Sequence, residues 1–511
     1  GNAYATYESA SSGHGTNNDS DPRPARVSTV MIALNNYING REVRSTARTT
    51  TTIVDPVTGN AYATAPKSNA ADLDAAFRAA TDAFKTWKET TPAERQLLLL
   101  KIADALMEHK DELAAAECKN CGKPRQLTID EELQQGADQI RFFAGACRVL
   151  EGKSAGCYMR GMLSFIVREP VGVCAAVTPW NYPLLMAVWK WAPALAAGNT
   201  MVLKPAGATP ISTLLMARIM GEILPPGVFN VVCGERETGE LMVGHPTPAM
   251  ISITGSVRAG RQVAAGAAAG LKRVHLELGG KAPVVVFADA DLATAAADIA
   301  LAGFFNAGQD CTAATRVVVE AAAHEKLVAL LAEQATAHIK TGAAEGMDAE
   351  GVLVGPLNNR AQFERVKGFL ARVPAHARVV AGGAPLPGPG FFIAPTVVAG
   401  LRQDDELVQQ EVFGPVITVQ PFADEAQAVA MANGVEYGLA SSVWTADHGR
   451  ALRCALAFDF GCVWINAHIP LVAEMPHGGF KQSGYGKDLG TYSFEEYTRV
   501  KHVMSSLASK L

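Results

Sequence analysis

The run VGVCAAV at Val171 to Val177 decides the fold, because it is the first of four short apolar segments that alternate with helical patterns. The other three are TMVL at Thr200 to Leu203, VFNVV at Val228 to Val232 and MISI at Met250 to Ile253. The helical patterns follow near 184–197, 210–223, 238–243 and 257–270. Short apolar strands that alternate with helices predict a parallel sheet with helices on both faces. The region is therefore predicted to be a Rossmann-like domain, with its ligand beyond the carboxyl ends of the strands.

Three polar loops emerge at those carboxyl ends: TPWN at Thr178 to Asn181, KPAG at Lys204 to Gly207, and TGS at Thr254 to Ser256. The last of them opens a helix, so its amides and the helix dipole favour a pyrophosphate. As a glycine motif alone TGSVRAG is weak, since an ordinary strand-to-helix turn explains it equally well.

A second α/β pattern follows the first one and is again built on short apolar strands. Its strands are PVVVF from Pro283, RVVVE from Arg316, VFGPVITV from Val412 and CVWIN from Cys462. Ahead of the first pattern, alanine and leucine recur at helical spacing over 71–88, 92–117 and 130–150. The chain is therefore predicted to be an α/β protein with two successive sheets.

Composition sets limits on the class of protein. The chain has 511 residues, 49% apolar and 19% charged, which is enough for two or three domains. A net charge of −5 without a basic run argues against nucleic acid as a partner, and no apolar stretch is long enough to span a membrane. Nine irregularly spaced cysteines predict reduced thiols. Cys118 and Cys121 form a lone CxxC at a helix end, so no metal site is predicted.

Two residues suggest catalysis. Cys311 lies in the loop sequence GQDCT just after a helical pattern, and Glu277 opens ELGGKAP ahead of it, so the first suspects are a nucleophile and a base. Taken alone, Cys311 is more simply explained as a small buried residue, and Glu277 as a charge at a strand edge. The surrounding sequence decides between these explanations.

Together with TPWNYP from Thr178, FGP from Phe413 and PHGGFKQSGYG from Pro476, these motifs resemble the aldehyde dehydrogenase superfamily in order and spacing. The resemblance runs from about Asn36 to about Met504. It implies that the Cys311 thiolate attacks the aldehyde, that the Asn181 side-chain amide and the Cys311 backbone amide bind the oxyanion, and that Glu277 activates the hydrolytic water.

The resemblance also implies three structural parts. Residues 31–151 and 170–276 form the NAD(P)-binding domain, 277–480 the catalytic domain, and 152–169 with 481–503 a β arm for oligomerisation. We expect residues 1–30 to be a disordered tail, since they hold few large apolar residues, and 504–511 to be a C-terminal tail. A homodimer or homotetramer is expected.

The cofactor implied by the resemblance is NAD. Lys204 is expected at the adenosine ribose and Glu411 at the nicotinamide ribose. The family pattern has a glutamate where this chain has Gly207, and that carboxylate repels a 2′-phosphate, so we also expect measurable use of NADP. The other residues matched to the cofactor site are Thr178, Pro179, Trp180, Thr254, Gly255, Ser256, Leu278 and Phe413.

For the substrate, the segments NYPLLMAVWK, RFFAG, GQDCTAA and EMPHGGFKQSGYGK are most similar to the aminoaldehyde branch, particularly γ-aminobutyraldehyde dehydrogenases. Tyr182 and Trp189 match aromatic tunnel positions, which can hold an ammonium group. Glu132 and Glu474 are the expected carboxylate partners of that ammonium. Oxidation of betaine aldehyde or succinate semialdehyde, a coenzyme A-acylating relative and a catalytically silent relative remain alternatives, although a coenzyme A-acylating enzyme lacks the base that Glu277 supplies.

The final residues Ser509, Lys510 and Leu511 form the tripeptide read by the peroxisomal import receptor. They predict a peroxisomal protein, and the alternative is a frayed terminus in a cytoplasmic enzyme.

Overall fold

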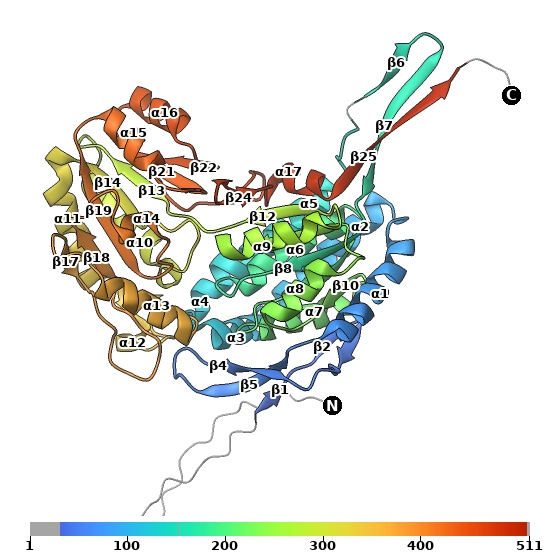
Figure 1. Cartoon of the computed structure of the whole chain (residues 1–511), viewed down its shortest axis with the longest axis horizontal. Coiled ribbons are helices and arrows are strands. Elements are labelled where there is room, and N and C mark those ends of the chain that lie inside the picture. The colour runs from blue at the N-terminus through green and yellow to red at the C-terminus, as the bar shows by residue number, and fades with distance from the viewer. Residues whose placement is uncertain (1–30, 153, 508–511) are drawn as a thin grey trace, which may run out of the picture.

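The computed structural model of this chain describes residues 31–152 and 154–507 (Figure 1). The predicted tail at 1–30 and the tripeptide Ser509 to Leu511 lie outside the described residues. Two large sheets with their helices form the body, and a narrow three-stranded arm projects from it (Figure 1).

The first large sheet has eight strands, and its centre is the predicted Rossmann-like unit. The chain runs from β8 outward through β9 and β10, then returns to place β11 and β12 on the other side of β8, all parallel. This reversal is a topological switch point, where ligands of such sheets bind. The strand order is β24 (Gly484–Tyr485), β12 (Arg273–Glu277), β11 (Met250–Thr254), β8 (Val173–Val177), β9 (Thr200–Lys204), β10 (Phe229–Val231), β2 (Asn36–Ile38) and β3 (Arg41–Val43).

Helices cover both faces of this sheet, and their sequences account for where they begin. Thr91 caps the second helix through a reciprocal bond with Glu94, and Pro92 occupies its first turn. The pattern over 92–117, expected to be one helix, is divided at His109, whose ψ of 16° leaves the helical region. The helices are α1 (Ala70–Trp87), α2 (Pro92–Glu108), α3 (Lys110–Cys121), α4 (Arg125–Leu127), a π-helix η1 (Thr128–Leu133), α5 (Gln134–Ala146), α6 (Pro183–Ala196), α7 (Ile211–Gly221), α8 (Arg236–Gly244), α9 (Val257–Ala268) and α17 (Gly490–Glu496).

The second large sheet has seven strands, six of them parallel, and forms the core of the other half of the body. Its order is β17 (Arg378–Ala381), β18 (Thr396–Ala399), β19 (Val416–Phe422), β14 (Arg316–Glu320), β13 (Pro283–Val286), β21 (Ala440–Trp444) and β22 (Cys462–Ile465). Its helices are α10 (Leu292–Phe304), η2 (Phe305–Gly308), η3 (Ala321–Ala323), α11 (His324–Glu333), η4 (Gln334–His338), α12 (Gly342–Glu345), α13 (Arg360–Ala371), α14 (Glu406–Gln409), α15 (Glu425–Asn433) and α16 (His448–Ala457).

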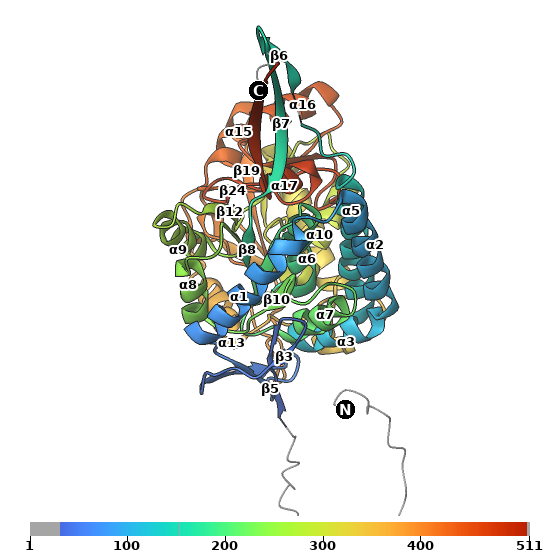
Figure 2. The same cartoon turned by 90° about the vertical axis from the view of Figure 1, so that its right-hand side faces the viewer.

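The arm is an antiparallel sheet in which β25 (Thr498–Ser506) pairs with β7 (Met162–Pro170), and β7 pairs with β6 (Ala155–Met159). Figure 2 shows how thin it is seen from the side. The second segment of the arm, expected at 481–503, contributes fewer residues than predicted. Strand β24 extends the first large sheet by pairing with β12, and α17 packs on α5 and α6. Residues 481–497 therefore belong to the body, and β25 continues to Ser506, past the expected limit of 503.

Smaller sheets complete the described chain. They are β1 (Ile32–Ala33), β5 (Ala61–Pro66) and β4 (Thr50–Val54); β15 (Lys340–Thr341) with β16 (Val352–Val354); and β20 (Tyr437–Gly438) with β23 (Phe480–Lys481). Among the described residues, no helix has the length and apolar character needed to cross a bilayer.

Candidate active site

The loop that carries Cys311 has an unusual backbone. After α10 the chain turns through Asn306, Ala307 and Gly308, all with positive φ (48°, 56° and 68°). A Cβ on Gly308 would lie 2.2 Å from the carbonyl oxygen of Gly414, so only glycine fits there. Gln309 holds the loop, since its Nε2 donates to the Asn306 carbonyl at 2.9 Å and its Oε1 accepts from the Asn358 amide at 2.8 Å. The strained loop is thus fixed on both sides before it reaches Cys311.

Asn181, the predicted oxyanion donor, lies beside this loop. Its Nδ2 donates to the Gln309 backbone carbonyl at 3.0 Å, and the backbone carbonyl of Asn181 accepts from Asn306 Nδ2 at 3.1 Å. One of its two N–H bonds is therefore used to fix the amide, and the second is available to an oxyanion. Asn181 and Cys311 come from the two different halves of the body, so the fold itself brings them together.

Glu277 is the last residue of β12, and two glycines behind it allow the halves to approach closely. A Cβ on Gly280 would lie 2.1 Å from the Cys311 carbonyl oxygen. The ligating atoms of Glu277, Cys311 and His477 all lie within 4.8 Å of one another, and His477 Nε2 is 3.9 Å from Glu277 Oε1. Such a trio has the chemistry of a metal site as well as of a nucleophile and a base. The absence of a metal site therefore stays a prediction.

Burial dominates the electrostatics of this trio. It raises the pKa of Glu277 to about 8, although the Lys190 ammonium acts in the opposite direction. Burial also raises the pKa of the Cys311 thiol well above its ordinary value, and the carboxylates of Glu277 and Asp310 add to that shift. Burial lowers the pKa of His477 to about 4, so this ring is neutral at pH 7. At pH 7 the site thus holds a Cys311 thiol next to a mostly protonated Glu277. Above pH 8 most of the Glu277 side chains are ionised and can act as the base.

Two cavities meet at Cys311. One, of about 440 Å³, extends along η1, α5 and α6, and the other, of about 610 Å³, opens beyond the carboxyl ends of β8, β11 and β12. Both are lined by Cys311, while Asn181 and Glu277 line only the second. This is the arrangement needed to bring two different molecules to one sulfur atom, because each can enter from its own side. We refer to the first cavity as the tunnel and to the second as the cleft.

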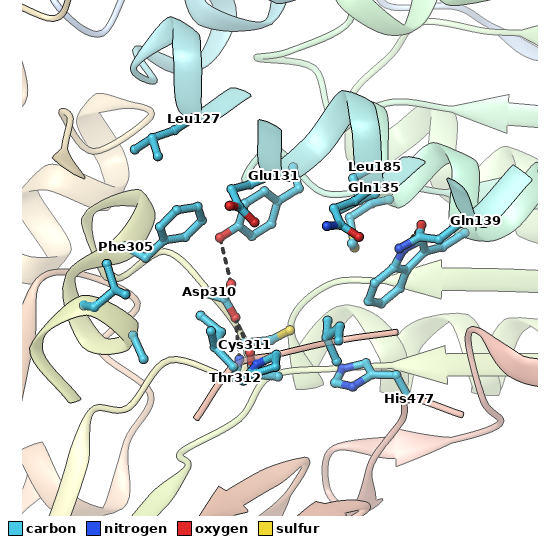
Figure 3. Close-up of a pocket in the computed structure, with 18 of the residues that line it drawn as sticks. Leu127, Glu131, Gln135, Gln139, Leu185, Phe305, Asp310, Cys311, Thr312 and His477 are labelled. Atoms are coloured by element: carbon cyan, nitrogen blue, oxygen red, sulfur yellow. Dashed lines mark hydrogen bonds between the residues drawn. The ribbon is translucent and has the colours of Figure 1, made fainter. Parts of the chain in front are cut away.

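The tunnel is mostly apolar and contains two of the four predicted substrate residues. Tyr182 and Trp189 line it, and each is held by a hydrogen bond: Tyr182 donates to Asp310 Oδ2 at 2.7 Å and the Trp189 indole to Gln139 Oε1 at 2.8 Å. The polar lining consists of Glu131, Gln135, Gln139, Asp310, Thr312 and His477 (Figure 3). Glu474 is exposed and is not among the lining residues, so its predicted place in the tunnel is wrong.

Glu132 is also wrongly predicted as a tunnel residue. Its Oε1 accepts from Lys123 Nζ at 2.6 Å inside the protein, where Glu117 also lies 3.8 Å from the same ammonium. Lys123 in turn sits over the Tyr182 ring, 4.3 Å from its centroid. The neighbouring acid, Glu131, lines the tunnel instead. Glu132 therefore supports the wall from behind and has no access to a substrate.

The exchange of these two acids has a local cause. Residues Thr128–Leu133 form a π-helix, which is wider than an α-helix and shifts the faces of the residues that follow. The tunnel-facing residues Leu127, Glu131, Gln135 and Gln139 recur every four positions across this stretch. In an ordinary α-helix Gln135 and Gln139, three and seven positions after Glu132, would share its face, whereas in the structure they line the tunnel with Glu131. Gln135 and Gln139 lie four and eight positions from Glu131, but by spacing alone they suit Glu132 equally, so the sequence held no signal that separates the two acids.

Because Glu132 is a buried ion-pair partner, Glu132→Gln is expected to lower stability and to leave substrate discrimination unchanged. The substitution removes the nearer of two carboxylates and leaves the buried Lys123 ammonium with Glu117 alone, at 3.8 Å; breaking a buried ion pair typically costs about 3 kcal/mol. Urea unfolding followed by tryptophan fluorescence measures this loss, with the exposed Glu131→Gln as the matched control. An unchanged unfolding midpoint would contradict a structural role for Glu132.

The cleft contains most of the residues predicted to hold the cofactor, and their chemistry suits a dinucleotide. Pro179, Trp180, Thr254, Gly255, Ser256, Leu278, Glu411 and Phe413 all line it. Ser256 caps α9 and lines the cleft, and the first-turn amides of a helix can bind an anion such as a pyrophosphate. Thr254 Oγ1, which lines the cleft, is buried without a hydrogen-bond partner among the described residues, so it is free to bond a ligand. The residues present therefore fit a dinucleotide.

Thr178, Lys204 and Gly207 do not line the cleft as described, although Lys204 ends β9 beside it. Glu411 is placed by the amide of Gly280, which donates to its Oε1 at 2.8 Å, and burial raises the pKa of this acid to about 7. Sequence reasoning missed Arg258, Asn359, Gln362 and Arg365 in the cleft and His477 in the tunnel. Gln362 holds the Phe413 loop by donating to its carbonyl at 2.7 Å, a tertiary contact without a local motif.

The comparison with known proteins agrees with this geometry. The model of the aldehyde dehydrogenase family matches residues 43–503. This protein belongs to the aldehyde dehydrogenase family. Three solved structures resemble it closely, and each gives a TM-score of 0.90.

Betaine aldehyde dehydrogenase from Staphylococcus aureus, solved in complex with NAD+, is 33% identical to this chain, and the match covers 94% of this chain and 96% of that one. PnpE from Pseudomonas sp. WBC-3 is 36% identical, with coverage of 94% and 99%. A variant aldehyde dehydrogenase from Bacillus cereus is 36% identical, with coverage of 93% and 97%. The aldehyde dehydrogenase fold predicted from the motifs is thereby confirmed.

Proposed function

We propose that this aldehyde dehydrogenase uses NAD to oxidise an aldehyde that carries a positive charge some distance from its carbonyl group, of the 4-aminobutanal type. The observation that supports this most is the charge of the tunnel. Its lining holds two carboxylates, Glu131 and Asp310, and among the described lining residues there is no lysine or arginine. A tunnel of this sign favours a cationic substrate.

The two carboxylates differ in how free they are to bind an ammonium. Asp310 already accepts bonds from Tyr182 and from the Thr312 amide and hydroxyl, the last two at 2.7 Å. Glu131 is exposed to solvent along the tunnel, and Figure 3 places it across the cavity from Cys311. Glu131 is thus the acid that meets a charge far from the reacting carbon.

The distance between the charged group and the aldehyde carbon distinguishes the candidate substrates. In betaine aldehyde the ammonium is one carbon from the aldehyde, so it would lie near Asp310 and the aromatic rings rather than near Glu131. That reading is kept as a second candidate because a betaine aldehyde dehydrogenase is 33% identical to this chain. Succinate semialdehyde carries a carboxylate, which both tunnel acids repel. Glu277 beside Cys311 argues against a coenzyme A-acylating or silent relative.

The first chemical step follows from the trio. The Cys311 thiol loses its proton to water as its sulfur forms a bond to the aldehyde carbon, so Glu277 is not consumed in this step. The negative charge that develops on the aldehyde oxygen accepts hydrogen bonds from Asn181 Nδ2 and the Cys311 backbone amide. The result is a tetrahedral adduct on Cys311, which can release a hydride because its oxygen is charged.

Glu411 would hold the ribose of a nicotinamide bound in the cleft, which would accept that hydride, and loss of the hydride would convert the adduct into a thioester on Cys311. Glu277 then takes a proton from a water molecule, which attacks the thioester carbon. The carbon–sulfur bond breaks, the carboxylic acid leaves, and the sulfur is again protonated.

The test of substrate charge is Glu131→Gln. We expect kcat/KM for 4-aminobutanal to fall roughly tenfold, mainly through a higher KM, because a charge-assisted contact is lost. Butanal, which has the same chain and no charge, should be oxidised as before. Steady-state production of reduced cofactor with both substrates measures this.

The matched control is Asp138→Asn, which removes a charge from the exposed side of α5, outside the tunnel lining. It should alter neither substrate. Equal changes for 4-aminobutanal and butanal in Glu131→Gln would contradict the proposal, and a wild-type kcat/KM higher for betaine aldehyde than for 4-aminobutanal would favour the second candidate.

A further inference from the structure

The second strand of the Rossmann-like unit, β9, ends without an acidic residue. In sheets of this kind an Asp or Glu at the corresponding place bonds the hydroxyls of the adenosine ribose and selects NAD over NADP. Here β9 ends at Lys204 and the loop after it reads Pro205, Ala206, Gly207, and none of these carries a carboxylate. The sequence therefore has no acidic side chain at the position that discriminates between the two cofactors.

In the folded chain a carboxylate stands at that place. The three atoms nearest to a Cβ added at Gly207 all belong to Glu235: Oε1 at 2.4 Å, the carboxyl carbon at 2.6 Å and Oε2 at 2.8 Å. Glu235 comes from the loop after β10, the strand that pairs with β9, and it directly precedes α8. The acid absent from one loop is thus delivered by its neighbour.

The Glu235 carboxylate is held in this position. Thr51 Oγ1 donates to its Oε1 at 2.8 Å, and the side chain does not cap its own helix, although Glu235 is the N-cap residue of α8. It remains only half-buried, so its second oxygen can reach a ligand. The ammonium of Lys204 lies beside it, buried and donating to the Pro205 and Gly234 carbonyls, both at 3.0 Å. An acid and a lysine therefore flank the end of β9.

We propose that Glu235 binds the adenosine ribose hydroxyls of NAD in place of a side chain at position 207, and that its charge disfavours the 2′-phosphate of NADP. This inference rests on the proposed use of a nicotinamide dinucleotide and is independent of the aldehyde. It also revises the expected use of NADP, whose premise was that no carboxylate stands at this point. The site is built from two loops, and a side chain at 207 would displace the Glu235 carboxylate from its present position.

Isothermal titration of the full-length protein with NAD+ and NADP+ tests the proposal without turnover. In Glu235→Gln the Kd for NAD+ should rise roughly tenfold, because a charge-assisted hydrogen bond becomes a neutral one, while the Kd for NADP+ should fall. Glu237→Gln, in the exposed first turn of the same helix, is the matched control and should change neither Kd.

A second variant guards against a purely structural effect. Gly207→Glu alone should weaken NAD+ binding, because the new side chain collides with Glu235. Combined with Glu235→Ala, the same substitution should restore NAD+ binding, since the carboxylate then comes from position 207. If wild-type protein binds NAD+ and Glu235→Gln changes neither affinity, Glu235 does not select the cofactor. If wild-type protein binds neither dinucleotide, the proposed function itself fails.

Discussion

Cys311→Ala is expected to abolish aldehyde oxidation, with a loss of roughly 10⁴-fold or more, and to leave no covalent adduct with the substrate. The tunnel and the cleft have Cys311 as a common wall, and the oxyanion donors and the base converge on it. Without the sulfur, no adduct forms and the aldehyde remains a poor hydride donor. Rapid-mixing absorbance of reduced cofactor and intact-protein mass spectrometry measure the two losses.

Cys462→Ala is the matched control for this substitution. Cys462 is a free cysteine that packs with Cys311 in the same small apolar cluster around Ala282, Leu439 and Ala440. Its removal should leave oxidation within about twofold of wild type. Residual turnover in Cys311→Ala at more than a few per cent would mean that another nucleophile, or direct hydride transfer from a hydrated aldehyde, carries the reaction.

The elements that sequence reasoning placed well are those whose signal is local. Strand β14 was predicted with its observed limits, and β8, β9, β10 and β11 within two residues, because strands buried on both faces are continuous apolar runs ended by polar loops. Cys311, Asn181 and Glu277 converge because each follows directly from a strand end or a glycine-rich turn. The local sequence around each of these residues is therefore enough to predict where its side chain lies.

The failures lie where residues from distant segments combine. Glu132 and Glu131 exchange places because a π-helix alters the face of a helical stretch that reads as ordinary in sequence. Glu235 reaches Gly207 from another loop, and no spacing rule joins positions 28 residues apart that depend on the pairing of β9 with β10. Both errors concern residues that determine ligand specificity. Such a side chain can come from any segment that lies near the ligand, so no local sequence pattern identifies it.

Glu277→Gln is expected to fail differently from Cys311→Ala. The adduct and the hydride step need only the Cys311 thiolate and the oxyanion donors, so one equivalent of reduced cofactor should appear in a burst. Turnover should then stall, because the amide cannot take a proton from water, and the thioester should accumulate on Cys311. Steady-state kcat should fall by roughly 10²-fold or more, within the range of general-base contributions. Mass spectrometry detects the acyl-enzyme.

The pH dependence provides an independent check on Glu277. Burial raises its pKa to about 8, so the basic form is the minor species below that pH and the major species above it. Wild-type deacylation should therefore increase with pH from 6 and level off above about 8, whereas in Glu277→Gln this rise should vanish. Added hydroxylamine, which attacks thioesters without a base, should release the stalled enzyme and restore cofactor reduction. A Glu277→Gln enzyme that turns over with the wild-type pH profile would show that bulk water or another group deacylates Cys311, and that Glu277 serves only to shape the cleft.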